Sequence, residues 1–172
     1  MNESIINLVP MTADMYRRYF REYESDPDLL LRGQAYCPYT YSEDRVEKYV
    51  QRQAALKRLP LAILCDGEIV GEIILRDIEA RVCATMSITL KNARYKDRGI
   101  GTRAERLAIR YVFDELDIPV LYADAVQTNT RSCHVLEKVG FALIREDEDY
   151  RYYQINREDS RPLKGNAHEQ LF

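Results

Sequence analysis

Residues 95–102 read YKDRGIGT, and this stretch joins a strand-like segment to a helix-like one through two glycines. The segment before it, about 83–90, has the pattern of a strand, and from Thr102 apolar residues recur at helical spacing. A helix that begins at such a turn leaves backbone N–H groups unpaired, at the positive end of its dipole. This geometry binds anions, so the sequence predicts an anion site at Gly99 and Gly101.

The residues around the turn support the same prediction. Gly99 and Gly101 have no Cβ atom to keep a phosphate from the backbone, and Thr102 adds a hydroxyl donor. The chain has a formal charge of -3, yet this stretch is basic. The basic residues are Lys91, Arg94, Lys96, Arg98, Arg103 and Arg106, opposed only by Asp97 and Glu105. A local basic excess in an acidic chain favours a polyanionic ligand.

Two common phosphate-binding loops do not fit the spacing. A Walker loop requires GxxxxGK[ST], and no lysine follows Gly101. The dinucleotide fingerprint requires a third glycine where this chain has Ala104, and it follows the first strand, whereas three strands are predicted before this turn. Taken alone, the stretch also leaves open a loop turn that binds nothing.

The whole chain is typical of one globular domain. Its 172 residues are 46% hydrophobic and 31% charged, and no tract approaches the roughly 20 apolar residues that span a bilayer. The N-terminal MNESIINLVPM has no basic leader before an apolar run, so we expect a cytoplasmic protein. The four cysteines lack metal-ligand spacing, so we predict no metal site and expect small buried thiols.

The apolar periodicity predicts an α+β domain. Thr12 and Ser42 are expected to cap helices at about 13–24 and 43–57. Strands are predicted at 61–65, 68–75, 83–90, 120–126 and 151–157, with further helices from Thr102 to before Pro119 and at 130–139. The order ααβββαβαβ predicts one domain over residues 1–158, followed by a polar tail over 159–172.

Two motifs together resemble a known family. KDRGIGT, at 96–102, resembles the acetyl-CoA signature of the GNAT superfamily of N-acetyltransferases, [RQ]-x-x-G-x-[GA], with Lys96 in place of the usual Arg or Gln. NTRSCHVLEKVGF, at 129–141, is similar to its second signature, an Asn followed eleven residues later by Gly-Phe. The SxxVLEKxGF wording from Ser132 places the resemblance nearest to the RimJ/RimL-type ribosomal-protein N-terminal acetyltransferases.

The resemblance covers about residues 5–157 and implies the GNAT fold. In that fold a mixed, mostly antiparallel sheet, flanked by helices, splays open at the acetyl-CoA site. The resemblance implies that the turn amides hold the pyrophosphate of coenzyme A, and that the pantetheine arm pairs with the end of the preceding strand. The implied cofactor-binding residues are Ile88, Leu90, Lys96, Arg98, Gly99, Ile100, Gly101, Thr102, Asn129 and Ser132.

The resemblance also implies an acetyl-CoA-dependent N-acetyltransferase, an acyltransferase in which a primary amine attacks the thioester directly. Many members carry a tyrosine seven residues after the motif asparagine as general acid, but this chain has Leu136. Asp124, five residues before Asn129, is the first candidate for the base, with a purely structural strand aspartate as the alternative. Glu72 is the second candidate, acting through water, and its alternative is a solvated strand face.

The amine acceptor stays open among a protein N-terminus, an aminoglycoside and a polyamine. The acceptor side in this family is lined by the irregular segment that holds Tyr36, Tyr39, Tyr41, Asp26 and Asp28. Acidic and aromatic groups suit a cationic amine, although these tyrosines could also only pack.

A second hypothesis is a catalytically silent acyl-CoA-binding regulatory module, suggested by the missing tyrosine. A nucleic-acid site is disfavoured because the basic cluster lacks interleaved aromatic residues apart from Tyr95. No membrane partner is expected, and we expect a monomer or a homodimer.

Overall fold

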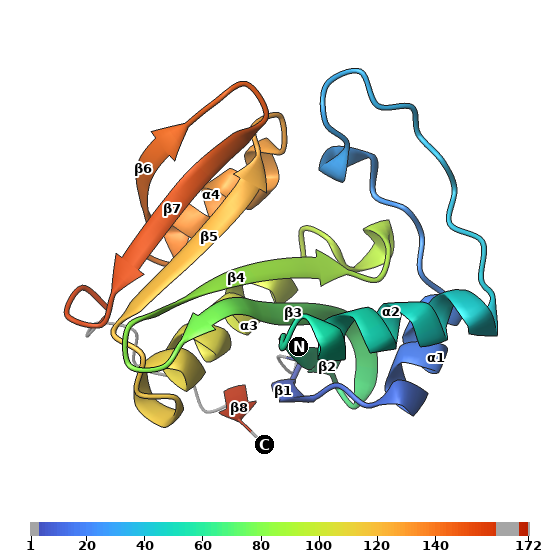
Figure 1. Cartoon of the computed structure of the whole chain (residues 1–172), viewed down its shortest axis with the longest axis horizontal. Coiled ribbons are helices and arrows are strands. Elements are labelled where there is room, and N and C mark those ends of the chain that lie inside the picture. Colours follow the sequence, from blue (N-terminus) through green and yellow to red (C-terminus); the bar gives the residue numbers. More distant parts are fainter. Residues whose placement is uncertain (1–3, 161–168, 172) are drawn as a thin grey trace.

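The computed structural model describes residues 4–160 and 169–171. Its centre is an eight-stranded sheet in the order β6-β7-β5-β4-β3-β2-β1-β8 (Figure 1). The strands are β1 (Ile6–Pro10), β2 (Leu59–Cys65), β3 (Glu68–Glu79), β4 (Cys83–Leu90), β5 (Val120–Val126), β6 (Ala142–Glu146), β7 (Tyr150–Asn156) and β8 (Glu169–Leu171). Only the β4–β5 and β1–β8 pairs are parallel among the described strands, so the predicted mixed, mostly antiparallel sheet is confirmed.

Helices flank both faces of this sheet. They are α1 (Ala13–Arg21), α2 (Glu43–Ala55), α3 (Ile100–Arg110) and α4 (Thr130–Lys138), with short helical turns η1 (Pro27–Leu29), η2 (Ala93–Tyr95) and η3 (Tyr111–Glu115). In Figure 1, α1 and α2 lie in front of the sheet, and α3 and α4 lie behind it. Each side has its own apolar cluster, one around Tyr19 and Phe20 of α1, the other around Leu107 of α3.

Local sequence signals explain where the first elements begin. The Thr12 hydroxyl accepts a hydrogen bond from the Met15 amide at 3.2 Å, and Ser42 caps α2 in the same way. Asp66 and Gly67 have φ values of 52° and 83°, as a two-residue hairpin turn requires. The predicted helices and the first hairpin are therefore confirmed.

The sheet splays open between β4 and β5. These parallel strands pair only from Cys83 with Val120 to Met86 with Ala123. Beyond this point β4 continues along β3 as far as Leu90, while Figure 1 shows β5 diverging from it. Among the described strands, the last residues of β4 therefore have a partner on one edge only, and the predicted splay is confirmed.

Three strands were not predicted. β1 pairs with β2 and closes one side of the core, and β6 pairs with β7 although all five of its residues are exposed. β8 pairs with β1 and comes from the predicted tail; residues 161–168 and 172 of that tail lie outside the described residues. Within residues 4–160 and 169–171, no helix combines the length and apolarity needed to cross a membrane.

Candidate active site

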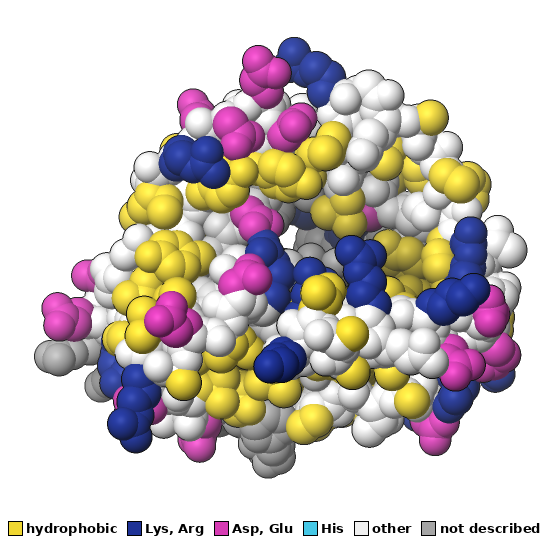
Figure 2. Space-filling model, in the orientation of Figure 1, with side chains coloured by type: hydrophobic (Ala, Val, Ile, Leu, Met, Phe, Trp, Pro, Cys, Tyr) yellow, Lys and Arg dark blue, Asp and Glu magenta, His cyan; other side chains and the backbone are white. Residues whose placement is uncertain are grey.

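A pocket of about 330 Å³ lies where β4 ends and where α3 and α4 begin. Eight of the ten predicted cofactor-binding residues line it: Ile88, Leu90, Lys96, Gly99, Gly101, Thr102, Asn129 and Ser132. Arg98 and Ile100 do not line this pocket. The Arg98 side chain is exposed, and the Ile100 side chain is buried in the core. Figure 2 shows the same face hollowed at its centre, with Lys and Arg side chains around the hollow.

The glycine turn opens onto this pocket. Gly99 has a φ of 73° and precedes α3 without a side-chain cap, so the N-cap residue itself leaves the first amides of the helix open. A Cβ atom on Gly101 would meet nothing closer than the Ile88 Cδ1 atom at 4.0 Å. The turn therefore combines a glycine conformation, an uncapped helix start and free space, which is the geometry of an anion site.

A second pocket of about 210 Å³ lies in the splay between β4 and β5. Ile88, Thr89, Asn129 and Ser132 line both pockets, so the two volumes are adjoining parts of one cleft. Asn129 helps to shape it, because its side-chain oxygen accepts a hydrogen bond from the Ser132 amide at 3.0 Å and starts α4 there. The cleft thus runs from the glycine turn into the splay.

Asp124, the first candidate for the base, lies on the wall of the splay pocket. Its carboxylate forms an ion pair with Arg76 of β3, and the two side chains are 26% and 24% exposed. Arg76 also contacts Asp77 at 2.7 Å, outside the pocket. Asp124 is therefore a partly buried carboxylate, held by a cation, at the place where the two strands part.

Glu72 lies elsewhere, beneath α1 and α2, and lines neither pocket. Its carboxylate accepts hydrogen bonds from the Tyr16 hydroxyl at 2.9 Å and the Tyr49 hydroxyl at 2.7 Å. Burial raises the pKa of Glu72, and the two tyrosine hydrogen bonds oppose that shift. The residue is 5% exposed, so the expectation of a solvated strand face was wrong: the helices cover it.

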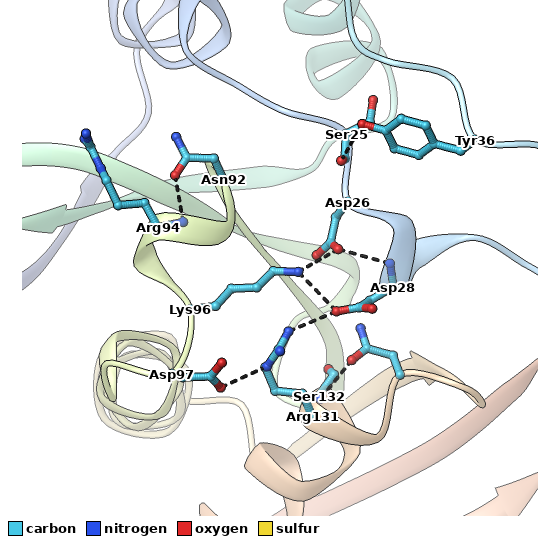
Figure 3. A network of polar contacts seen from close by, with 11 residues as sticks. Ser25, Asp26, Asp28, Tyr36, Asn92, Arg94, Lys96, Asp97, Arg131 and Ser132 are labelled. Atoms are coloured by element: carbon cyan, nitrogen blue, oxygen red, sulfur yellow. Dashed lines mark hydrogen bonds and ion pairs between the residues drawn. The ribbon is translucent and has the colours of Figure 1, made fainter.

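Lys96 is held by acidic residues (Figure 3). Its ammonium group lies 2.6 Å from Asp26 Oδ1 and 3.1 Å from Asp28 Oδ2. Arg131 of α4 contacts Asp28 at 2.9 Å and Asp97 at 3.0 Å. Asp26 and Asp28 therefore tie the segment around η1 to the glycine turn and α4, which differs from the acceptor role expected for them.

The basic residues around the turn also form more ion pairs with acidic residues than the sequence indicates. Lys91 is only 3% exposed and contacts Glu22 at 2.8 Å and Glu68 at 3.1 Å. Its partners come from α1 and β3, far away in the chain, so a local count of charges could not include them. The prediction that only Asp97 and Glu105 oppose the cluster was wrong for this reason.

The predicted acceptor tyrosines mostly pack. Tyr39 stacks on Phe20 with ring centroids 5.3 Å apart, and Tyr41 donates a hydrogen bond to Glu43. Tyr36 is 51% exposed, and its hydroxyl lies 3.4 Å from the Ser25 carbonyl oxygen. The packing alternative therefore holds for Tyr39, while Tyr36 keeps an exposed ring.

The cleft also contains residues that the sequence did not single out for it. Leu29 of η1 lines both pockets, and Tyr150 of β7 lines the splay pocket. Glu105 of α3 contributes to the wall of the first pocket. Its spacing was an available signal, because a residue four positions after Gly101 shares a helix face with it. Tyr150 gave no such signal, since its position depends on the pairing of β7 with β5.

Comparisons with known proteins agree with this geometry. The family model described as "Acetyltransferase (GNAT) domain" matches residues 6–142. The spermidine N(1)-acetyltransferase of Escherichia coli (strain K12) is 27% identical over 100 residues, which cover 58% of this chain and 52% of that protein. The chain thus matches about half the length of this curated relative.

Solved structures share the fold. Aminoglycoside acetyltransferase AAC(6')-Ib in complex with coenzyme A superimposes with a TM-score of 0.74 and 16% identity, covering 91% of this chain and 98% of that one. N-acetyltransferase PseH of Campylobacter jejuni gives a TM-score of 0.67 and 16% identity, covering 89% of this chain and 99% of that one. At such low identity the similarity establishes the fold alone.

Proposed function

The chain belongs to the GNAT acetyltransferase family, and from this premise we propose that it is an acetyl-CoA-dependent N-acetyltransferase that acts on a primary amine. One observation carries the proposal: the uncapped glycine turn and the splay are joined in one cleft. A cofactor with an anionic pyrophosphate and an extended arm fits such a cleft from end to end.

The residues present fit coenzyme A. The amides after Gly99 would hold the pyrophosphate, with space at Gly101 for its close approach. The edge of β4 that lacks a strand partner beyond Met86 would pair with the amides of the pantetheine arm. Asn129 and Ser132 would close the other side from α4. When bound, acetyl-CoA supplies the activated acetyl thioester.

The reaction is a direct transfer. The amine nitrogen forms a bond to the acetyl carbonyl carbon, the carbon–sulfur bond breaks, and the products are an N-acetyl amide and the coenzyme A thiol. A backbone N–H of β4 in the splay would stabilise the developing oxyanion. Asp124 takes the proton from the attacking amine, because it lines the splay pocket and Glu72 does not.

Leu136 occupies the place of the usual family acid and is buried in the wall of the splay pocket. Tyr150 of β7 lines the same pocket, and its hydroxyl would protonate the leaving thiolate. A thiolate is a fairly stable leaving group, so this assistance is modest. Tyr150→Phe should therefore lower kcat less than a change at Asp124.

The proposed acceptor is a small cationic amine. The named relatives act on spermidine and on aminoglycosides, and Asp124 offers a carboxylate where the amine would enter. The RimJ/RimL-type resemblance of the second motif keeps a protein N-terminus as the alternative acceptor. An amine panel with spermidine, an aminoglycoside and a peptide with a free N-terminus separates these classes.

The test measures thiol release from acetyl-CoA with each amine, beside coenzyme A binding. Asp124→Asn should lower kcat about 100-fold and leave coenzyme A affinity within about twofold. Asp77→Asn is the matched control, because Asp77 contacts the same Arg76 but lines neither pocket. Binding of coenzyme A without thiol release for any amine would instead support a silent acyl-CoA-binding module.

A further inference from the structure

Glu105 is a buried carboxyl group to which the proposed reaction assigns no role. It lies on α3 with 1% of its surface exposed, and its Oε2 atom has no hydrogen-bond partner among the described residues. Buried polar groups are nearly always paired, because an unpaired one loses its hydrogen bonds to water without replacement. Since Glu105 also contributes to the wall of the first pocket, the missing partner points to a ligand.

The charged and titratable groups on neighbouring elements do not supply that partner. Among the residues whose side chains are described, they are Arg103, Arg106 and Arg110 on α3 itself, Lys96 and Asp97 at the glycine turn, Arg131, His134, Glu137 and Lys138 on α4, Glu68, Glu72, Arg76, Asp77 and Glu79 on β3, Cys83 on β4, and Tyr111, Asp114 and Glu115 on η3. Burial raises the pKa of Glu105 to about 8. At neutral pH the group is therefore a carboxylic acid.

The position of Glu105 indicates what it would bind. It lies one helical turn beyond Gly101, and the same pocket is lined by Ile88 and Leu90 at the end of β4. The proposed pyrophosphate lies at the turn, so the first part of the pantetheine arm would pass here. A carboxylic acid can donate one hydrogen bond and accept another, and an amide of the arm offers the complementary acceptor and donor.

We propose that Glu105, as a neutral acid, hydrogen-bonds an amide of the pantetheine arm and thereby makes coenzyme A affinity depend on pH. This inference rests on the proposed function, because it requires coenzyme A in this pocket. Ionisation removes the O–H donor and places a negative charge in the same pocket as the phosphates. Affinity should therefore fall as the pH rises through the range in which Glu105 loses its proton.

The experiment is a calorimetric titration with coenzyme A from about pH 6.5 to about pH 9. Wild type should lose about tenfold more affinity over this range than Glu105→Gln, whose amide both donates and accepts but does not titrate. Glu115→Gln is the matched control, because Glu115 follows α3 in η3, is exposed and lines neither pocket. This control should show the same dependence of coenzyme A affinity on pH as wild type. Because coenzyme A titrates identically with every variant, its own ionisations cancel in the comparison.

A second measurement uses the wild-type protein and guards against a variant that fails to fold. Near pH 8.5, coenzyme A binding in buffers of different ionisation enthalpy should reveal net proton uptake approaching one proton. Glu105→Leu should bind about tenfold more weakly at neutral pH while keeping its fold by circular dichroism.

The outcomes separate the two proposals. Identical pH profiles for wild type and Glu105→Gln, or no proton uptake in wild type, would overturn the role of Glu105 and leave coenzyme A binding intact. An absence of coenzyme A binding at every pH would overturn the proposed function and this inference together.

Discussion

Glu72 and Glu105 are both buried, but their surroundings differ. Glu72 is 5% exposed and Glu105 is 1% exposed. The Glu72 carboxylate accepts hydrogen bonds from two tyrosine hydroxyls, one on α1 and one on α2. Glu105, on the helix behind the sheet in Figure 1, lies in a pocket wall, and its Oε2 atom has no hydrogen-bond partner in the part of the chain that the structure describes. The protein's own hydroxyl groups donate hydrogen bonds to Glu72, whereas Glu105 depends on an external group for its partner.

The difference teaches how to separate a structural polar group from a ligand-binding one. Burial alone does not decide, because both side chains are removed from water. What decides is whether the protein's own donors complete the hydrogen bonds. Variants at these two acids, and at two glycines that show the same contrast, can break or sharpen this distinction.

The largest effect is expected at Glu72. Glu72→Ala removes both acceptor oxygens and takes the acceptor from the buried Tyr16 hydroxyl and the partly buried Tyr49 hydroxyl. The free energy of unfolding should fall by about 4 kcal/mol, as for two lost hydrogen bonds to a charged group. Urea unfolding measures it, with Glu79→Ala at the exposed end of β3 as control. A loss below about 1 kcal/mol would mean that Glu72 does not hold α1 and α2 to the sheet.

The next effect is the pH dependence of stability that Glu105 causes. Burial raises its pKa from an ordinary 4.5 to about 8. Below about pH 4.5 both states are protonated; between these values the unfolded state releases a proton that the folded state keeps. Glu105 should therefore cost the fold about 3 kcal/mol by about pH 7, with a further loss up to about pH 8 and none above it.

The measurement compares wild type with Glu105→Gln in urea unfolding at several pH values. The difference in unfolding free energy between the two should move in favour of the variant as the pH rises, because glutamine does not ionise. All other titrating groups are shared and cancel. A constant difference would mean that Glu105 is already ionised, or paired, in the folded protein.

Much of the fold could be predicted where the sequence carries a local signal. The bounds of β4 and β5 were predicted correctly, because Lys91 follows β4 and β5 lies between Pro119 and Gln127. The caps at Thr12 and Ser42 were likewise readable. β6 could not be predicted, since its five residues are all exposed and show no alternation.

The site could be predicted in part for the same reason. The glycine turn and Asn129 belong to short motifs, and the structure brings them into one pocket. The burial of Lys91 and of Glu72 depends on partners from distant elements, so no local pattern could reveal it. The unpartnered state of Glu105 is likewise a property of packing between elements.

Gly71 and Gly101 differ much as the two acids do, because the protein fills the space at Gly71 and leaves the space at Gly101 open. A change at Gly71 should have the third largest effect on stability. A Cβ atom on Gly71 would lie 2.6 Å from the Thr89 carbonyl oxygen of the paired strand. The β3–β4 ladder would have to shift, so Gly71→Ala should lower the unfolding free energy by about 2 kcal/mol. Thermal unfolding followed by circular dichroism checks this. An unchanged midpoint would show that the strands yield more easily than this contact indicates.

Gly101→Ala should have the smallest effect. A Cβ atom there would approach nothing closer than 4.0 Å, and alanine suits the first turn of α3, so stability should rise by about 0.5 kcal/mol. Gly99→Ala is the matched control, because a φ of 73° strains alanine and should cost about 1 kcal/mol. If Gly101→Ala destabilised the protein as much as Gly71→Ala, the protein would need the open space at the glycine turn for its own stability, and that space would not be a ligand site. If it kept the fold and bound coenzyme A within about threefold of wild type, the pyrophosphate would not need the space that the structure leaves open at Gly101.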